Sequence, residues 1–487
     1  MGLELIGIIV SAIAIGTLFY SRAWTLTVLC VALLLQASAA ITLHALGGSP
    51  VAPGYLMILF LAIAVLIRQN GAGRVLQTLT LDRSEYLLML FVAWAVVTSI
   101  FMPRIFQGMF EVYPLGQDNL LGPLRKQMIS PLSSNIAQAV YYVGDLSVFI
   151  LVGAMLISMR SLRPAAYAVL ISAIVNIGLV IVDSVTFATG TDQILDFIRN
   201  ANYVQRAGDI VLGMKRVTGM FAEASAFSMH ALGLFAFTFR LWRGGVSLPF
   251  TGLAAAGTFI ALVMSTSSTA FAALAIYLMI VMPRDFSGID RTLPRGRERV
   301  ARTSLLFSML PALGVLIAIA IALRPDLLDP VNEMINEMLI NKLDSDSGVE
   351  RMNWNMSAIQ NFFDSFGLGV GLGTIQTSSF AISLISSTGF LGLLVYIIFL
   401  TKVFSTNGGR RFQTLPAQED AQIAAAARSG MIALIIANSL SGGASPGLIF
   451  YIFAAMAAYK IVEAPVFGTY GEPDPELPDE FGEAKMA

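Results

Sequence analysis

The sequence predicts an all-α, polytopic integral membrane protein with about thirteen transmembrane helices. Of its 487 residues, 56% are hydrophobic and only 13% are charged, and apolar runs recur along the whole chain. Soluble proteins carry about 25% charged residues, and a helix needs about 20 apolar residues to cross a bilayer. A membrane β-barrel would show short alternating strands instead. These observations exclude a soluble globular domain.

The apolar runs define thirteen expected spans within a single transmembrane domain, residues 1–463. The spans cover residues 3–20, 24–44, 53–67, 85–102, 135–158, 164–187, 222–241, 248–264, 270–281, 304–323, 381–401, 429–440 and 447–461. The remaining residues, 464–487, are acidic and contain prolines, so we expect a disordered tail.

Lys and Arg predict the orientation, because these residues are retained on the cytoplasmic side. One set of alternate loops holds about twice as many of them as the other set. The poorer set contains the three long loops, 103–134, 189–221 and 324–380, which we therefore place outside. Two helical patterns in the last loop, at 331–339 and 352–366, predict short amphipathic helices. Long external loops indicate that the function is carried out on that side.

The composition gives no reason to expect a cofactor or nucleic acid. The net charge is −1, and the single cysteine, Cys30, cannot form a disulfide within the chain. Two histidines offer no histidine cluster for a metal. The glycine run at 367–373 lacks the Gly-Lys-Ser/Thr of a nucleotide-binding loop, and we expect it to form a tight turn that re-enters the membrane.

Ionisable residues inside apolar runs are candidates for function, because a charge in hydrocarbon costs about 2.5 kcal/mol or more. Asp145, Asp183, Glu223 and His230 are such residues. Glu223 and His230 are seven positions apart and share a helix face. Asp145 shares a face with Asn135, Gln138 and Tyr142. Each face is consistent either with a functional cavity or with ordinary hydrogen bonding between packed helices.

Ten basic residues lie in the external loops, and most of them are expected to be solvated. They are Arg104, Arg125, Lys126, Arg199, Arg206, Lys215, Arg216, Arg324, Lys342 and Arg351. Arg216 and Arg351 adjoin apolar runs and precede glycine-containing segments. An arginine at the membrane surface suits a lipid-linked diphosphate, because guanidinium binds phosphate oxygens in pairs.

Several segments together resemble the superfamily of O-antigen polymerases and O-antigen ligases, which are polytopic membrane glycosyltransferases. RVTGMFAEASAFSMHAL, beginning at Arg216, resembles the family's Arg, Gly-Phe, Glu-Pro-Asn segment. LVMSTSSTAFAAL resembles its serine-rich helix break, and ERMNWNMSAIQNFFDSFGLGVGLG resembles the Arg, Trp, Phe-x-Asp-x-Pro, Gly-x-Gly-x-Gly segment of its last large external loop. STGFLGLLVYIIFL resembles the helix that follows. The matches span about residues 216–400.

Three departures from the family pattern limit what the resemblance implies for this chain, and a fourth, an absent histidine, favours a polymerase. Ala-Ser follows Glu223 in place of Pro-Asn, and Ser268 and Phe366 stand where Arg and Pro are common. Ligases of the family place a histidine in the large late external loop, whereas residues 324–380 contain none.

The resemblance implies a transferase that uses polyprenyl-diphosphate-linked oligosaccharide as donor and a glycan as acceptor, at the periplasmic face of the bacterial cytoplasmic (inner) membrane. The product would be O-antigen or another exopolysaccharide, and a chain-length regulator is an implied partner. We expect four catalytic residues: Glu223, Arg216, Arg351 and, in reserve, Asp145. The residues expected to bind substrate are Lys215, Arg206, His230, Trp354, Gly369 and Gly371. A ligase, and a flippase or ion-coupled transporter, remain the alternatives.

Overall fold

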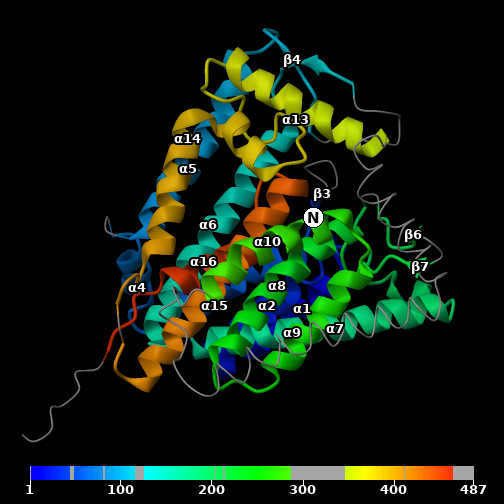
Figure 1. Cartoon of the computed structure of the whole chain (residues 1–487). Coiled ribbons are helices and arrows are strands. Elements are labelled where there is room, and N and C mark those ends of the chain that lie inside the picture. Colours follow the sequence, from blue (N-terminus) through cyan, green and yellow to red (C-terminus); the bar gives the residue numbers. More distant parts are fainter. Residues whose placement is uncertain are drawn as a thin grey trace, which may run out of the picture.

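The computed structural model describes residues 2–43, 49–80, 83–115, 125–202, 205–211, 214–286, 346–410 and 412–463. These residues form fourteen α-helices and only short strands (Figure 1). The all-α fold class is therefore confirmed. The expected span at 304–323, the amphipathic pattern at 331–339 and the tail at 464–487 lie outside the described residues.

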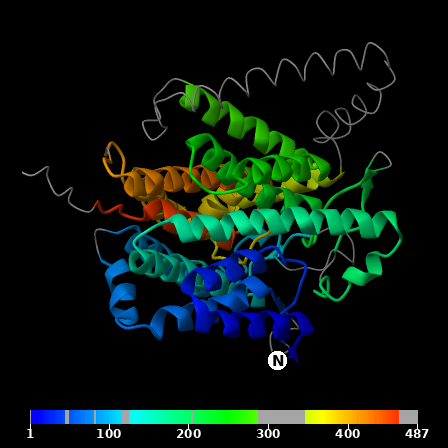
Figure 2. The same cartoon turned by 90° about the horizontal axis from the view of Figure 1, so that it is seen from below.

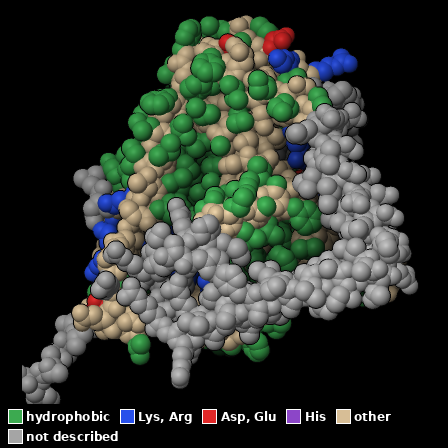
Figure 3. Space-filling view, in the orientation of Figure 1, with side chains coloured by type: hydrophobic (Ala, Val, Ile, Leu, Met, Phe, Trp, Pro, Cys, Tyr) green, Lys and Arg blue, Asp and Glu red, His purple; other side chains and the backbone are tan. Residues whose placement is uncertain are grey.

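Five helices in the described part of the chain are long and apolar enough to cross a membrane. They are α5 (Ser84–Ile105), α6 (Ser133–Met159), α7 (Arg163–Ala188), α14 (Phe380–Ser405) and α15 (Leu415–Ser441). A sixth candidate is the pair α3 (Pro53–Leu66) and α4 (Gly71–Thr78), which is bent by 113°. Hydrophobic side chains cover the flank over α14 (Figure 3), where Phe390, Leu391 and Leu394 are exposed. These features indicate a multi-pass membrane protein.

The expected count of thirteen spans is too high, because several apolar runs form helices that are too short. These are α1 (Leu5–Tyr20), α2 (Arg22–Ala32), α9 (Thr251–Met264), the apolar part Ser268–Val281 of α10 (Ser268–Phe286), and α16 (Leu448–Ala458). The apolar run at 24–44, for example, leaves the helix after Ala32 and ends in a strand. Eleven helical residues rise only about 17 Å, whereas the hydrocarbon core is about 30 Å thick.

Helix α8 (Ala224–Gly244) lies inside the bundle and is not among the candidate spans. It packs against α9 and α15, and most of its residues are buried. A Cβ atom on Gly233 would lie 2.9 Å from Leu434 of α15, so the two helices approach closely at this glycine. Figure 2 shows α7 crossing the molecule between the N-terminal helices and α8–α10. The first residues of α8 are thereby held in the interior.

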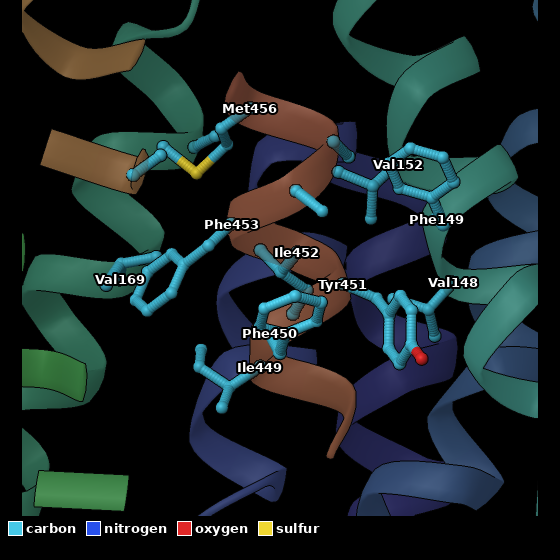
Figure 4. Close-up of a cluster of buried hydrophobic side chains, with 14 of the residues drawn as sticks. Val148, Phe149, Val152, Val169, Ile449, Phe450, Tyr451, Ile452, Phe453 and Met456 are labelled. Atoms are coloured by element: carbon cyan, nitrogen blue, oxygen red, sulfur yellow. The ribbon is translucent and has the colours of Figure 1, made fainter. Parts of the chain in front are cut away.

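The core of the bundle surrounds α16, whose side chains are almost all buried. Figure 4 shows Phe453 pointing to one side of this helix and Tyr451 to the other. The Phe453 ring stacks on Phe237 of α8 with a centroid separation of 5.1 Å. A Cβ on Gly430 of α15 would lie 2.6 Å from the Phe453 ring, which explains glycine at that contact. A short helix can therefore be fully buried without spanning a bilayer.

Short strands lie in the segments before and between the helices. β4 (Glu111–Val112) pairs with β5 (Gln127–Met128) between α5 and α6, and β6 (Ile210–Val211) pairs with β7 (Met214–Lys215) before α8. A third sheet joins β1 (Gly2–Leu3), β2 (Ile41–Leu43) and β3 (Ser49–Val51). Helix α13 (Asp346–Asp364) lies across the same end of the molecule as β4 (Figure 1). The amphipathic pattern at 352–366 is thus largely helical, as expected.

The glycine run at 367–373 packs into a break in α14. The break lies at Gly389, which has φ 69° and ψ −173°. The amide of Val370 donates to the carbonyl of Ser386, and the amide of Gly371 donates to the carbonyl of Ser387. The amide of Phe390 donates to the carbonyl of Gly367, and all three hydrogen bonds are 2.9 Å long. The run therefore satisfies backbone groups that the broken helix leaves unpaired.

Candidate functional site

A cavity of about 400 Å³ lies among the ends of several helices. Its walls come from the segment after α2, the start of α3, the first turns of α6 and α8, the last turns of α15, and the loop that leads into α16. The hydrogen-bonding side chains that line it are Gln36, Ser38, Tyr55, Gln138, Tyr141, His230, Asn438 and Ser445. This volume is within the usual range of small-molecule sites, about 300–1,000 Å³.

The cavity lies at the helix ends that the long loops join. Residues 103–134 lead into the first turns of α6, residues 189–221 lead into α8, and α13 contacts the end of α15. Ser38, in the cavity wall, donates a 2.5 Å hydrogen bond to the carbonyl of Ile198 in the second of these loops. The amide of Ala37 donates to the carbonyl of Met220. The loops and the cavity thus form one continuous region.

His230 lines the cavity from α8. Its side chain is 4% exposed, and its Nε2 atom has no hydrogen-bond partner within the protein. The ring packs at 5.3 Å from the centroid of Phe221. Leaving a buried polar atom unpaired costs free energy, and the residue that carries it borders the cavity.

Glu223 occupies the N-cap position of the same helix without a capping side-chain hydrogen bond, three residues before the cavity residue Ala226. The carboxylate is half-buried and accepts a hydrogen bond from Ser225. The amide of Arg206 donates to the carbonyl of Ala222 over 2.7 Å, so the exposed Arg206 lies beside Glu223. The structure therefore places the backbone of Arg206 against the residue before Glu223, and Glu223 lies about two turns before His230 on the chain.

Asp145 lies behind the cavity wall in α6. It is 1% exposed, and Ser445 donates a 2.6 Å hydrogen bond to its Oδ2 atom, whereas Oδ1 has no partner within the protein. Ser445 itself lines the cavity and accepts a hydrogen bond from the amide of Gly447. The carboxylate thus contacts the cavity through one serine.

Arg351 reaches the cavity region from α13. Its Nη1 atom donates a 2.9 Å hydrogen bond to Ser441, the last residue of α15, one turn beyond the cavity residue Asn438. The Asn355 side-chain nitrogen donates to Ser378 Oγ, and the Ser378 amide donates to Asn355 Oδ1. These two hydrogen bonds hold α13 against the segment before α14. Trp354, on the inner face of α13, is 9% exposed, and its Nε1 atom has no partner within the protein.

Lys215 and Arg216 point to different surroundings. Lys215 is 8% exposed and forms an ion pair with Asp183 at 2.6 Å, and Arg199 pairs with the same carboxylate. Lys215 and Arg199 border a second cavity of about 330 Å³. Arg216 is 25% exposed and lies 3.8 Å from Asp209. Neither Lys215 nor Arg216 lines the first cavity.

Gly369 and Gly371 also lie apart from the first cavity. Both have positive φ, 84° and 90°. Their amides donate to Ser365 Oγ and to the Ser387 carbonyl, so neither amide is free for a phosphate group. The observed role of the two glycines is close packing against neighbouring backbone.

Most of the cavity residues could not be identified from the sequence alone, because they are far apart along the chain. Gln138 and His230 were exceptions, since Gln138 shares a helix face with Asp145 and His230 is an ionisable residue in an apolar run. Gln36, Tyr55, Asn438 and Ser445 gave no individual signal. Among the described residues, no three His, Cys, Asp or Glu side chains are grouped to hold a metal ion.

Comparison of the chain with family models, curated proteins and solved structures gave no match.

Proposed function

We propose that the chain is a polysaccharide polymerase that transfers polyprenyl-diphosphate-linked glycan repeats at the outer face of the bacterial cytoplasmic membrane. The observation that carries the proposal is the cavity at the helix ends joined by the long loops, with Arg351 bonded to Ser441, one turn beyond the wall residue Asn438. Amide, hydroxyl and aromatic side chains in one cavity suit a sugar, and guanidinium suits a diphosphate.

In the proposed reaction, a hydroxyl of the acceptor glycan attacks the anomeric carbon of the donor sugar. The new glycosidic C–O bond forms as the bond from that carbon to the diphosphate oxygen breaks, and polyprenyl diphosphate leaves with the electron pair. The proton of the acceptor hydroxyl passes to a carboxylate, for which Glu223 at the start of α8 is the nominee and Asp145 the reserve. The energy comes from the activated donor.

The leaving diphosphate gains negative charge as the bond breaks, and fixed cations stabilise that charge. Arg351 is the first candidate, because its contact with Ser441 holds it near the cavity. Arg216 is the second, since it is partly exposed and only loosely paired with Asp209. Removal of a single electrostatic donor of this kind lowers turnover by about 10² to 10³.

An ion-coupled transporter or flippase is the second candidate, and Asp145 is the observation that favours it. A buried carboxylate with one unpaired oxygen inside a candidate span resembles a coupling-ion site. A ligase that transfers finished glycan in one step shares the chemistry of the polymerase and differs in its products.

The test compares glycan chain lengths from cells that carry Arg351→Ala with those from cells that carry Arg125→Ala. Arg125 is an exposed residue of the first long loop and serves as the matched control. With equal amounts of both variants in the membrane, we expect Arg351→Ala to lose long chains while single lipid-linked repeats accumulate outside. Long chains of normal length in Arg351→Ala would refute the assigned role of Arg351, and repeats retained inside would indicate transport.

A further inference from the structure

The lining of the first cavity carries no formal charge among the residues that the structure describes. Its polar groups are amides, hydroxyls and one imidazole, and the remaining lining residues are apolar or glycine. Every Lys, Arg, Asp and Glu described near the cavity stands outside or behind its wall. Arg351 bonds to Ser441, Glu223 precedes Ala226, and Asp145 contacts Ser445.

A diphosphate is a poor ligand for such a lining. A buried anion needs cationic partners or several hydrogen-bond donors, and without them its transfer from water is costly. A carboxylate on a sugar would have the same difficulty. An uncharged sugar ring instead requires hydroxyl partners and apolar faces.

The lining supplies both kinds of partner. Gln138 of α6, Asn438 of α15 and His230 of α8 approach the cavity from three helices. His230 borders the cavity and has a buried Nε2 atom without a partner within the protein, so it is the third polar residue that we assign to a sugar hydroxyl. The ring of Tyr55 packs on that of Tyr141 with centroids 4.9 Å apart, and both residues border the same space.

We propose that the cavity binds an uncharged sugar of the glycan and rejects sugars that carry a carboxylate, while the diphosphate stays outside the cavity, on the side of Arg351. The proposal rests on the proposed function because it takes a glycan as the ligand. It adds the substrate class and assigns His230, Gln138 and Asn438 to sugar binding. The volume of about 400 Å³ limits the enclosed part of the glycan to a small fragment.

Saturation-transfer NMR on the full chain in nanodiscs tests this selectivity directly. The probes are methyl β-glucoside, methyl β-galactoside and methyl β-glucuronide, with empty nanodiscs as the blank. We expect transfer to at least one neutral glycoside and none to the glucuronide. Gln138→Leu should weaken binding of the neutral glycoside about tenfold, the effect of one lost hydrogen bond, whereas Arg125→Ala should leave it unchanged.

A variant that gains binding distinguishes a change in selectivity from loss of binding through misfolding. Gln138→Lys places a cation in the lining, so we expect this variant to bind the glucuronide and to bind the neutral glycoside less well. Equal binding of glucuronide and neutral glycosides by the unmodified protein would overturn the proposal. If the unmodified protein binds none of the three probes although its thermal unfolding shows that it is folded, the proposal is also overturned.

Sugar binding and glycosyl transfer can fail separately. In one outcome, the protein binds a neutral glycoside selectively while its presence in cells leaves glycan length unaffected. That result would support the neutral-sugar cavity and refute the polymerase. If the protein extends glycan chains but binds the glucuronide as well as it binds the neutral glycosides, the polymerase is supported and the selectivity is refuted.

Discussion

Lys215 Nζ lies 2.6 Å from Asp183 Oδ1, although the two residues are 32 positions apart and both side chains are nearly inaccessible. Arg199 pairs with the same oxygen, and the amides of Thr218 and Gly219 donate to the other oxygen at 3.3 and 3.2 Å. One carboxylate near the end of α7 thereby fixes both ends of the loop that leads to α8. The start of α8, with Glu223 and His230, depends on this anchor for its position.

Replacement of Asp183 by Ala should destabilise the protein by about 3–5 kcal/mol, because Arg199 and Lys215 would remain buried without a counter-charge. Thermal unfolding of the purified protein in nanodiscs measures the effect. Asp192→Ala provides the control, since Asp192 is an exposed residue of the same loop. An equal melting temperature for the two variants would show that the buried ion pairs contribute nothing to stability.

Replacement of Gly371 by Ala should prevent normal folding of the region between α13 and α14. Gly371 has φ 90°, and an added Cβ would lie 2.6 Å from the carbonyl oxygen of Thr98. Gly108→Ala is the matched control, because Gly108 also has positive φ, 74°, but an added Cβ meets open space. The control should lose about 1–2 kcal/mol, and Gly371→Ala should lose clearly more. Similar unfolding midpoints would contradict the close approach of the backbone at Gly371.

Replacement of Trp94 by Phe should weaken the break in α14. The Trp94 indole nitrogen donates a 2.8 Å hydrogen bond to the carbonyl of Thr388, immediately before Gly389. Loss of this donor removes one hydrogen bond beside the break, at a cost of about 0.5–1.5 kcal/mol. The exposed Trp24, changed to Phe, should have little effect. Hydrogen exchange at the break would increase in the first variant only, and unchanged exchange there would argue against this bracing role.

Replacement of Asp145 by Asn separates the polymerase from an ion-coupled transporter. An amide oxygen can still accept the hydrogen bond from Ser445. If Glu223 is the carboxylate at the acceptor, cells that carry Asp145→Asn should make glycan chains of nearly normal length. Loss of all glycan at the outer surface, with lipid-linked repeats held inside, would favour coupled transport instead.

The sequence was sufficient for the fold class and for several buried polar residues. Asp145, Asp183 and His230 stood out because ionisable groups in apolar runs need partners, and the structure finds these residues buried. The partners of Asp183 could not be chosen in advance, because the external loops hold ten cations and nothing in the sequence pairs any of them with Asp183. Their pairing depends on the path of the loop before α8.

The number of spans and the location of the cavity required the tertiary structure. Apolar composition does not distinguish a spanning helix from a buried one such as α16, since both are apolar throughout. The break at Gly389 was hidden in the continuous apolar run STGFLGLL. The cavity combines residues from 32 to 449, and no spacing in the sequence connects Gln36 with Asn438.

The central claim is that the chain forms glycosidic bonds from lipid-linked glycan, and reconstitution tests it most directly. The purified protein in liposomes would receive a lipid extract from cells that lack its gene and accumulate lipid-linked repeats. Mass spectrometry should then detect lipid-linked glycans extended by whole repeats, with one polyprenyl diphosphate released for each new bond. Unextended glycans that have only changed leaflet, with no polyprenyl diphosphate released, would contradict the account.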